Sequence, residues 1–241
     1  MSRVLIKSLI TITFLIMLMI VPVYGASVNK SVKVPAGGES SGESSVNGSI
    51  LVGDGAIVTG GLGTVNGAIR VGENAQIETV ETVNGSLTIS SGVKAGSLST
   101  VNGAIGIGAN TTVAGVIETV NGRISLDTGS SVSGNVENVN GDFSLTGSEI
   151  GGDLTTVNGN IDLSAASVIK GDINVEKPGG WSFGNSKSRQ PKIVIGPGSR
   201  VDGVIRLERE VKLFISESAE VGGVEGEMSM DDAVRFSGKR P

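Results

Sequence analysis

The chain has 241 residues, a formal net charge of −5, and no His or Cys. The acidic balance argues against nucleic acid or an anionic membrane surface as a partner. The missing His and Cys exclude disulfides, Cys nucleophiles, Ser-His triads and the ligands of most zinc sites. Its 38 Gly and few aromatic residues are unusual for a packed globule. Regularly spaced apolar residues nevertheless favour an ordered repeat fold over disorder.

Residues 1–25 have the pattern of a secretory signal peptide. Arg3 and Lys7 precede an apolar run over 9–23, and Val23 and Gly25 suit a cleavage site after Gly25. An uncleaved anchor is the rival interpretation, but the run is shorter than the roughly 20 residues of a membrane span. We expect a secreted chain in the periplasm, on the cell surface or outside the cell, with no stable membrane span after cleavage.

The mature chain is expected to begin with an N-terminal cap and a Gly/Ser-rich loop over 26–45, in which Val32 and Val34 form a partial rung. The tripeptide Val-Asn-Gly then recurs at intervals of 18 or 19 residues, which is the signature of a repeat architecture. The repeat region spans 46–175. Its candidate turn residues are Asn47, Asn66, Asn84, Asn102, Asn121, Asn140 and Asn158, followed by Gly48, Gly67, Gly85, Gly103, Gly122, Gly141 and Gly159.

Each repeat carries an apolar pair at positions i and i+2, such as Ile69 with Val71 and Leu87 with Ile89. Alternation with period two predicts short strands with one inward face. Because 18 residues divide into three sixes, we predict an all-β, single-domain, triangular parallel β-solenoid of about nine rungs. Parallel crossovers are nearly always right-handed, which favours a right-handed coil, although hexapeptide solenoids are a left-handed exception.

The Thr-Val-Asn phrase before each Gly has two interpretations. If Val points inward, Thr and Asn point outward on either side of it. Asn followed by Gly is then a corner at which both tolerate left-handed backbone, and stacked Asn side chains bond from rung to rung. The alternative is an ice-binding face built from the outward Thr and Asn.

An insertion over 176–192 interrupts the repeats before the final rungs at 193–224 and a C-terminal cap or tail at 225–241. The insertion holds Trp181 and Phe183 beside Lys187 and Arg189, a basic aromatic group on an acidic rod. These four residues form a candidate loop for binding a cell-surface glycan, a protein or another copy of the chain. The competing interpretation packs Trp181 against the side of the solenoid.

Carboxylates are the remaining candidates for chemistry. Asp142 with Asp162, and Asp153 with Asp172, are spaced by about one repeat, so each pair can stack on one face. Such pairs could bind a divalent cation, or they could be ordinary solvated positions. We assign no catalytic, metal or cofactor site, and we expect a protein that is not an enzyme.

Two bacterial groups share phrases with this chain. The segment from Ile193 to Ile205, IVIGPGSRVDGVI, resembles the bactofilins, which are polymer-forming solenoids and typically cytoplasmic. The T-V-N-G-x-I phrase resembles a class of secreted bacterial solenoids regarded as adhesins. Six-residue units such as VGENAQ at Val71 are similar to hexapeptide solenoids, but the enzymes of that family need His, so this likeness covers shape alone.

The sequence therefore predicts a non-enzymatic secreted scaffold, adhesin-like or polymer-forming protein, whose partner is itself or a surface glycan or protein. A carbohydrate-binding or carbohydrate-active β-helix protein is the first alternative, and an ice-binding solenoid is the second. No nucleic-acid partner and no cofactor are expected.

Overall fold

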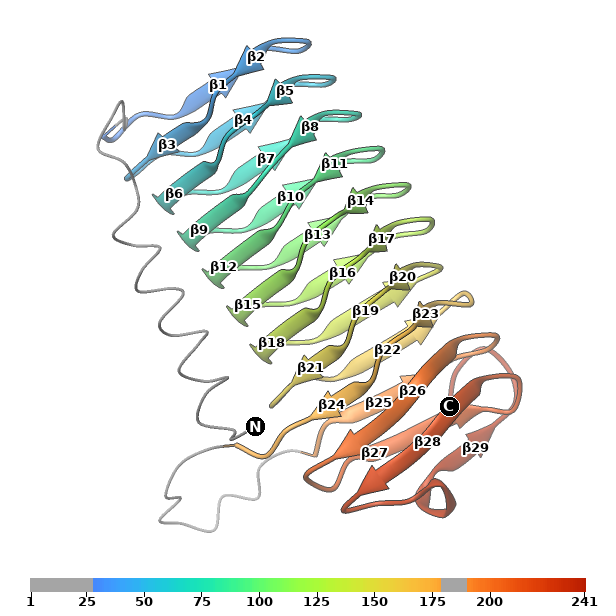
Figure 1. The fold of residues 1–241 in the computed structure, drawn as a ribbon. Coiled ribbons are helices and arrows are strands. Elements are labelled where there is room, and N and C mark those ends of the chain that lie inside the picture. Colours follow the sequence, from blue (N-terminus) through green and yellow to red (C-terminus); the bar gives the residue numbers. More distant parts are fainter. Residues whose placement is uncertain (1–27, 179–189) are drawn as a thin grey trace.

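Figure 1 shows the protein as a long stack of parallel strands, from β1 at one end to β29 at the other. This computed structural model describes residues 28–178 and 190–241. Every strand pairing in that part of the chain is parallel, and most turns of the coil contribute one strand to a first sheet and two to a second. The predicted all-β parallel solenoid is confirmed.

Within residues 28–178 and 190–241, the first sheet contains eleven strands that stack in chain order. Most are three residues long, and consecutive members align residue for residue, as when Leu87 pairs with Ile69 on one side and Ile105 on the other. Its strands are β1 (Val32–Val34), β4 (Ile50–Val52), β7 (Ile69–Val71), β10 (Leu87–Ile89), β13 (Ile105–Ile107), β16 (Ile124–Leu126), β19 (Phe143–Thr146), β22 (Ile161–Ser164), β25 (Lys192–Ile195), β27 (Lys212–Ser216) and β29 (Val234–Phe236).

The second sheet takes two strands from each turn, a short one and a longer one. The short strands are β2 (Glu39–Ser40), β5 (Ile57–Val58), β8 (Gln76–Ile77), β11 (Lys94–Ala95), β14 (Thr112–Val113), β17 (Ser131–Val132), β20 (Glu149–Ile150) and β23 (Val168–Ile169). The longer strands are β3 (Glu43–Ser45), β6 (Leu62–Asn66), β9 (Val80–Asn84), β12 (Leu98–Asn102), β15 (Ile117–Asn121), β18 (Val136–Asn140), β21 (Leu154–Thr156) and β24 (Ile173–Val175). In the last two turns the two strands merge into β26 (Arg200–Leu207) and β28 (Glu220–Gly226).

The core is a continuous column of aliphatic side chains inside the coil. The i, i+2 pairs supply its largest members, because residues two apart on a strand share one face. Ile69 and Val71 are buried, and Phe143 takes the equivalent place in β19. A ladder of like residues in register is the expected cross-section of a solenoid, in which each turn contacts mainly its neighbours.

The stack is longer than nine rungs, because structure begins and ends beyond the predicted limits. The stretch 37–45, expected to be a loop, contains β2 and β3, which pair with β5 and β6. At the other end the expected cap or tail contains a 3-10 helix, η1 (Met230–Asp232), and β29, which adds a last strand beside β27. The partial rung predicted at Val32 and Val34 is confirmed as β1, but Ser and Glu in β2 and β3 lack a hydropathy alternation, so the rest of this turn could not be predicted from the sequence.

Left-handed backbone occurs at the corner between the first-sheet strand and the short strand. One residue there has a φ between +51° and +76° in most turns. Gly and Asn fill most of these places, which fits their tolerance of that conformation. They are Gly37, Gly55, Asn74, Gly92, Asn110, Gly129, Gly147 and Gly198, with Ala165 and Ala166 in the turn after β22.

Candidate functional site

The Asn side chains of the repeated Val-Asn-Gly tripeptide form one hydrogen-bonded column along the rod, at the corner that follows each longer strand. The Gly of each tripeptide is called a corner glycine below. In each step the Nδ2 of one Asn donates to the Oδ1 of the Asn one turn earlier, at 2.7 to 2.9 Å. All seven bonds point the same way, so the amide dipoles align and reinforce one another. The column comprises Asn29, Asn47, Asn66, Asn84, Asn102, Asn121, Asn140 and Asn158.

Both ends of the Asn column have residues that the sequence did not single out. Asn29, with a φ of +57°, accepts the first bond from Asn47 at 2.7 Å. At the far end the Arg209 guanidinium donates to the Oδ1 of Asn158 at 3.0 Å and to the Val157 carbonyl at 3.2 Å. The positively charged Arg209 side chain therefore lies beside the last acceptor oxygen of the column, the Oδ1 of Asn158.

The predicted orientation of the Thr-Val-Asn phrase is wrong for Thr and Val. Thr64, Thr82, Thr100, Thr119 and Thr156 are buried, and Asn138 replaces Thr in its turn; the Val of the second to sixth repeats is only half-buried, and only Val157 is buried. In four turns the Thr hydroxyl donates to the carbonyl of the previous corner glycine, at 2.9 to 3.3 Å. That acceptor permits the burial, because a buried hydroxyl needs a partner. Thr is therefore absent from the outward face that the ice-binding alternative requires.

The corner glycines are required by close packing more than by left-handed backbone. A Cβ at Gly67, Gly85, Gly103, Gly122, Gly141 or Gly159 would lie well within 3.0 Å of the carbonyl oxygen of the previous corner glycine. Among the seven, Gly141 alone has a positive φ. The expected reason for Gly, tolerance of left-handed backbone, is thus wrong for most of the column.

The candidate binding loop lies outside the described residues, which include neither Trp181 and Phe183 nor Lys187 and Arg189. The two ends of the insertion are described, and the corner at 208–210 holds both. The Lys177 amide donates to Glu208 Oε2 at 3.0 Å, and Gln190 Nε2 donates to Glu210 Oε2 at 3.1 Å. The insertion therefore leaves and rejoins the rod at the Asn column's corner.

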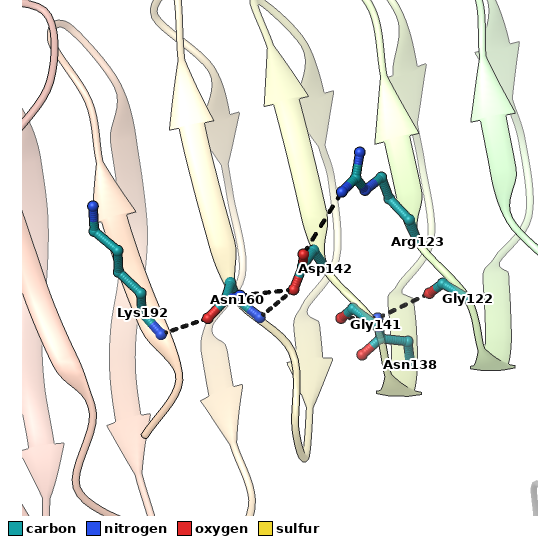
Figure 2. Close-up of polar contacts among 7 residues, drawn as sticks. All are labelled: Gly122, Arg123, Asn138, Gly141, Asp142, Asn160 and Lys192. Carbon is teal, nitrogen blue, oxygen red and sulfur yellow. Dashed lines mark hydrogen bonds and ion pairs between the residues drawn. The ribbon is translucent and has the colours of Figure 1, made fainter. Parts of the chain in front are cut away.

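A second row of polar contacts follows the corner and reaches the point where the insertion rejoins (Figure 2). Asp142 accepts from the Asn160 side chain at 2.9 Å and backbone at 3.1 Å, and it lies 3.8 Å from Arg123. Asn160 Oδ1 in turn accepts the backbone N–H of Lys192 at 2.8 Å. The predicted stacking of Asp142 with Asp162 is wrong, since Asp162 is in register with Ser144.

Asp153 and Asp172 do stack, but their carboxylates bind backbone N–H groups. The Asp172 amide donates to Asp153 Oδ1 at 2.8 Å, and the Val204 amide donates to Asp172 Oδ1 at 2.8 Å. Asp172 also pairs with Arg206. Among the residues of the described ranges, no three acidic side chains are grouped so that they could hold a metal ion.

A groove of about 770 Å³ opens on the outward face of the second sheet, beside the first residues of the insertion. Its floor is a row of outward side chains on consecutive strands: Glu137, Thr155, Asn174, Arg206 and Glu225. Its edges include Asp153 on one side and Glu176, Lys177, Glu208 and Glu227 at the corner. Five strands about 4.8 Å apart make the row roughly 19 Å long, parallel to the rod axis.

The groove is predominantly acidic, with six carboxylates and two basic side chains among its lining residues. Burial raises the pKa of Glu137, and the charges of Glu176 and Asp153 raise it further, while a hydrogen bond from Asn135 opposes them. In the adjacent turn, burial and the charge of Glu137 raise the pKa of Glu118. Excess negative charge favours a cationic over an anionic ligand.

Sequence reasoning missed this groove, although part of its signal is visible. Glu81, Glu118 and Glu137 each stand one residue before the Thr or Asn of the repeated phrase. Once Thr points inward, these positions must point outward and stack. The alignment of Asn174 with Arg206 was hidden, because the insertion separates them by 32 residues in sequence while they pair in register.

No family model matches the chain, and no match was found among curated proteins or solved structures. Across the described parts of the chain, no helix has the length and apolar character needed to cross a membrane.

Proposed function

We propose that this chain is a non-enzymatic, secreted surface-interaction protein in which a rigid solenoid presents the groove at 135–227 to an extended ligand. The observation that carries the proposal is the straight row of outward side chains from Glu137 to Glu225, held in register on consecutive strands. Hydrogen bonds between turns fix this row, so the surface is organised before any ligand arrives.

Secretion and an envelope location are part of the same proposal. They are supported by the signal-like residues 1–25, and an adhesive or scaffold role is supported by the resemblance of the repeats to secreted solenoids regarded as adhesins. The resemblance of Ile193 to Ile205 to the bactofilins adds end-to-end assembly as a form that this scaffold could take. Light scattering on the chain from Ala26 tests assembly separately from ligand binding.

A cationic linear polysaccharide is the ligand class that the groove favours. Its length suits an extended chain, and its excess of carboxylates suits amino groups. Titration calorimetry with chitosan oligosaccharides, and with neutral cello-oligosaccharides of matched length, tests this. We expect binding of the amino sugars that weakens with salt.

The substitution Thr155→Trp fills the groove floor, and Thr88→Trp is its matched control. Both threonines are outward strand residues, but Thr155 lines the groove while Thr88 lies on the first sheet. We expect Thr155→Trp to abolish binding and Thr88→Trp to preserve it. Equal affinity in both variants, or no binding by the native protein, would refute the groove as the interaction surface.

A carbohydrate-active protein is the second candidate, and one observation favours it. Glu137 has a raised pKa and lies in the groove with Asp153, and a carboxyl group with a raised pKa is suited to general acid catalysis. Release of reducing ends from the same oligosaccharides, and its loss in Glu137→Gln, would support this candidate over the non-enzymatic one.

A further inference from the structure

Seven Asn-Gly pairs in one chain are a chemical liability. At such pairs the Gly nitrogen can attack the Asn side-chain carbonyl carbon, forming a cyclic imide and releasing ammonia. Water then opens the imide at either carbonyl and leaves aspartate or isoaspartate; no oxidant or reductant is needed. Gly favours the reaction because it has no side chain to hinder the approach. Each repeat from 46 to 175 carries this sequence once, at the corner that follows its longer strand.

The geometry of the Asn column opposes that reaction. Cyclisation requires the side chain to rotate onto the amide that follows it, but each interior Asn is held at both ends by its neighbours in the column. Asn102 donates to Asn84 at 2.9 Å and accepts from Asn121 at 2.9 Å. The attacking nitrogen is engaged as well: the Gly103 amide donates to the Asn121 carbonyl at 3.1 Å, and that of Gly122 to Asn140 at 2.9 Å.

Reaction at one corner would also damage the corners beside it. An aspartate cannot donate the bond that Nδ2 supplies, so the previous Asn loses its partner and gains a carboxylate as neighbour. Isoaspartate adds a methylene to the backbone and would displace the apolar pair that follows each corner, as Leu87 and Ile89 follow Asn84. A repeat protein that keeps one Asn-Gly pair in each repeat therefore needs the column intact.

The end of the column is its weakest point, because within the described ranges no later Asn donates to the Oδ1 of Asn158. Arg209 reaches back across 51 residues of sequence and supplies that bond at 3.0 Å. The Gly159 amide donates to Thr156 Oγ1 at 3.0 Å. We propose that the Asn column protects its Asn-Gly pairs from deamidation in the folded protein and that Arg209 is the residue that protects Asn158.

Peptide mapping by mass spectrometry after prolonged incubation at mildly alkaline pH tests the proposal. In the native chain we expect conversion at Asn84 and Asn102 to be slower by at least about tenfold than in the same chain unfolded in urea, because several hydrogen bonds must break first. Equal rates in the folded and unfolded chains would overturn the protective role of the column, and this comparison requires no variant.

Arg209→Ala tests the second half of the proposal, with Lys212→Ala as a control that removes a nearby exposed cation. We expect Arg209→Ala to accelerate conversion at Asn158 severalfold while Asn102 stays slow, and Arg209→Lys to restore part of the protection. If Asn158 reacts equally slowly in Arg209→Ala and Lys212→Ala, with circular dichroism showing both folded, Arg209 has no such role.

Discussion

The Arg209 guanidinium donates to the Oδ1 of Asn158 at 3.0 Å, although five strands, β22 to β26, and the insertion lie between them in sequence. The corner after β24 would carry the next Asn of the column if the repeat continued, but the insertion begins there. Arg209 comes from the following corner and takes its place. Its neighbours Glu208 and Glu210 accept hydrogen bonds from the two ends of the insertion. The three consecutive residues 208–210 thus end the Asn column and hold both ends of the insertion.

Replacing an interior Asn should weaken the rod modestly. Asn102→Ala removes the bonds to Asn84 and Asn121, and we expect a loss of about 1–2 kcal/mol in the free energy of unfolding, since water can reach the exposed partners. Asn102→Asp keeps the shape but cannot donate, so it should also destabilise. Urea unfolding followed by circular dichroism measures both. The exposed Gln76→Ala serves as control, and a similar loss there would contradict the assigned role of the column.

Adding one methyl group at a corner glycine should cost more than removing an Asn side chain. A Cβ at Gly103 would overlap the carbonyl of Gly85, and neither backbone can move without breaking register. We expect Gly103→Ala to destabilise by about 2–3 kcal/mol. Gly63→Ala is the matched control, because nothing lies within 4 Å of a Cβ there and Gly63 has no positive φ. Thermal melts that give equal shifts for the two variants would refute the close-packing argument.

Strain in the turn after β22 offers a stabilising change. Ala166 has a φ of +60°, and its place corresponds to those of Asn74 and Asn110 in other turns. An L-residue with a Cβ pays about 1–2 kcal/mol for this conformation, and Asn tolerates it better. We expect Ala166→Asn to raise the free energy of unfolding by about 0.5–1 kcal/mol. Gly198→Ala makes the opposite change at an equivalent corner and should destabilise; a stabilisation there would contradict the argument.

Part of this architecture could be predicted from the sequence, and the rest depends on contacts that form only when the turns stack. The apolar pairs such as Leu87 with Ile89 reveal strands because burial alternates along them. The orientation of Thr100 did not follow, because hydropathy favours burying its neighbour Val101, and the carbonyl of Gly85 that accepts the Thr hydroxyl exists only once turns are stacked. Val83 was likewise expected to point inward as the Val of the phrase, but it follows the buried Thr82 on its strand and is only half-buried.

The groove was less predictable than the column because its register spans the insertion. Glu137, Thr155 and Asn174 can be aligned by counting repeats, but Arg206 joins them only after the chain has left and rejoined the rod. Sequence reasoning placed the binding site in the insertion itself, from its aromatic and basic residues. The described structure places an acidic groove next to it, formed by residues that look ordinary in isolation.

Stacked carboxylates should make the rod more stable in mild acid than at neutral pH. The pKa values of Glu81, Glu118 and Glu137 are raised, chiefly by burial, and those of Glu118 and Glu137 also by neighbouring negative charges. At pH values above 4.5, the ordinary pKa of a Glu carboxyl, these groups therefore bind more protons in the folded chain than in the unfolded chain. Stability from these groups is fully present below that value and is lost as pH rises through their folded pKa values.

Urea midpoints measured between about pH 5 and pH 7 should therefore fall as pH rises, and Glu137→Gln should flatten that fall. Removing the Glu137 carboxylate also removes a charge that raises the pKa of Glu118, so the variant affects both members of the pair. Glu73→Gln, at an exposed corner, is the control and should leave the slope unchanged. A slope that is the same in Glu137→Gln as in the native protein would mean that the stacked pair does not govern the pH dependence. A midpoint that rises with pH would mean that carboxylates stabilised in their charged form dominate instead.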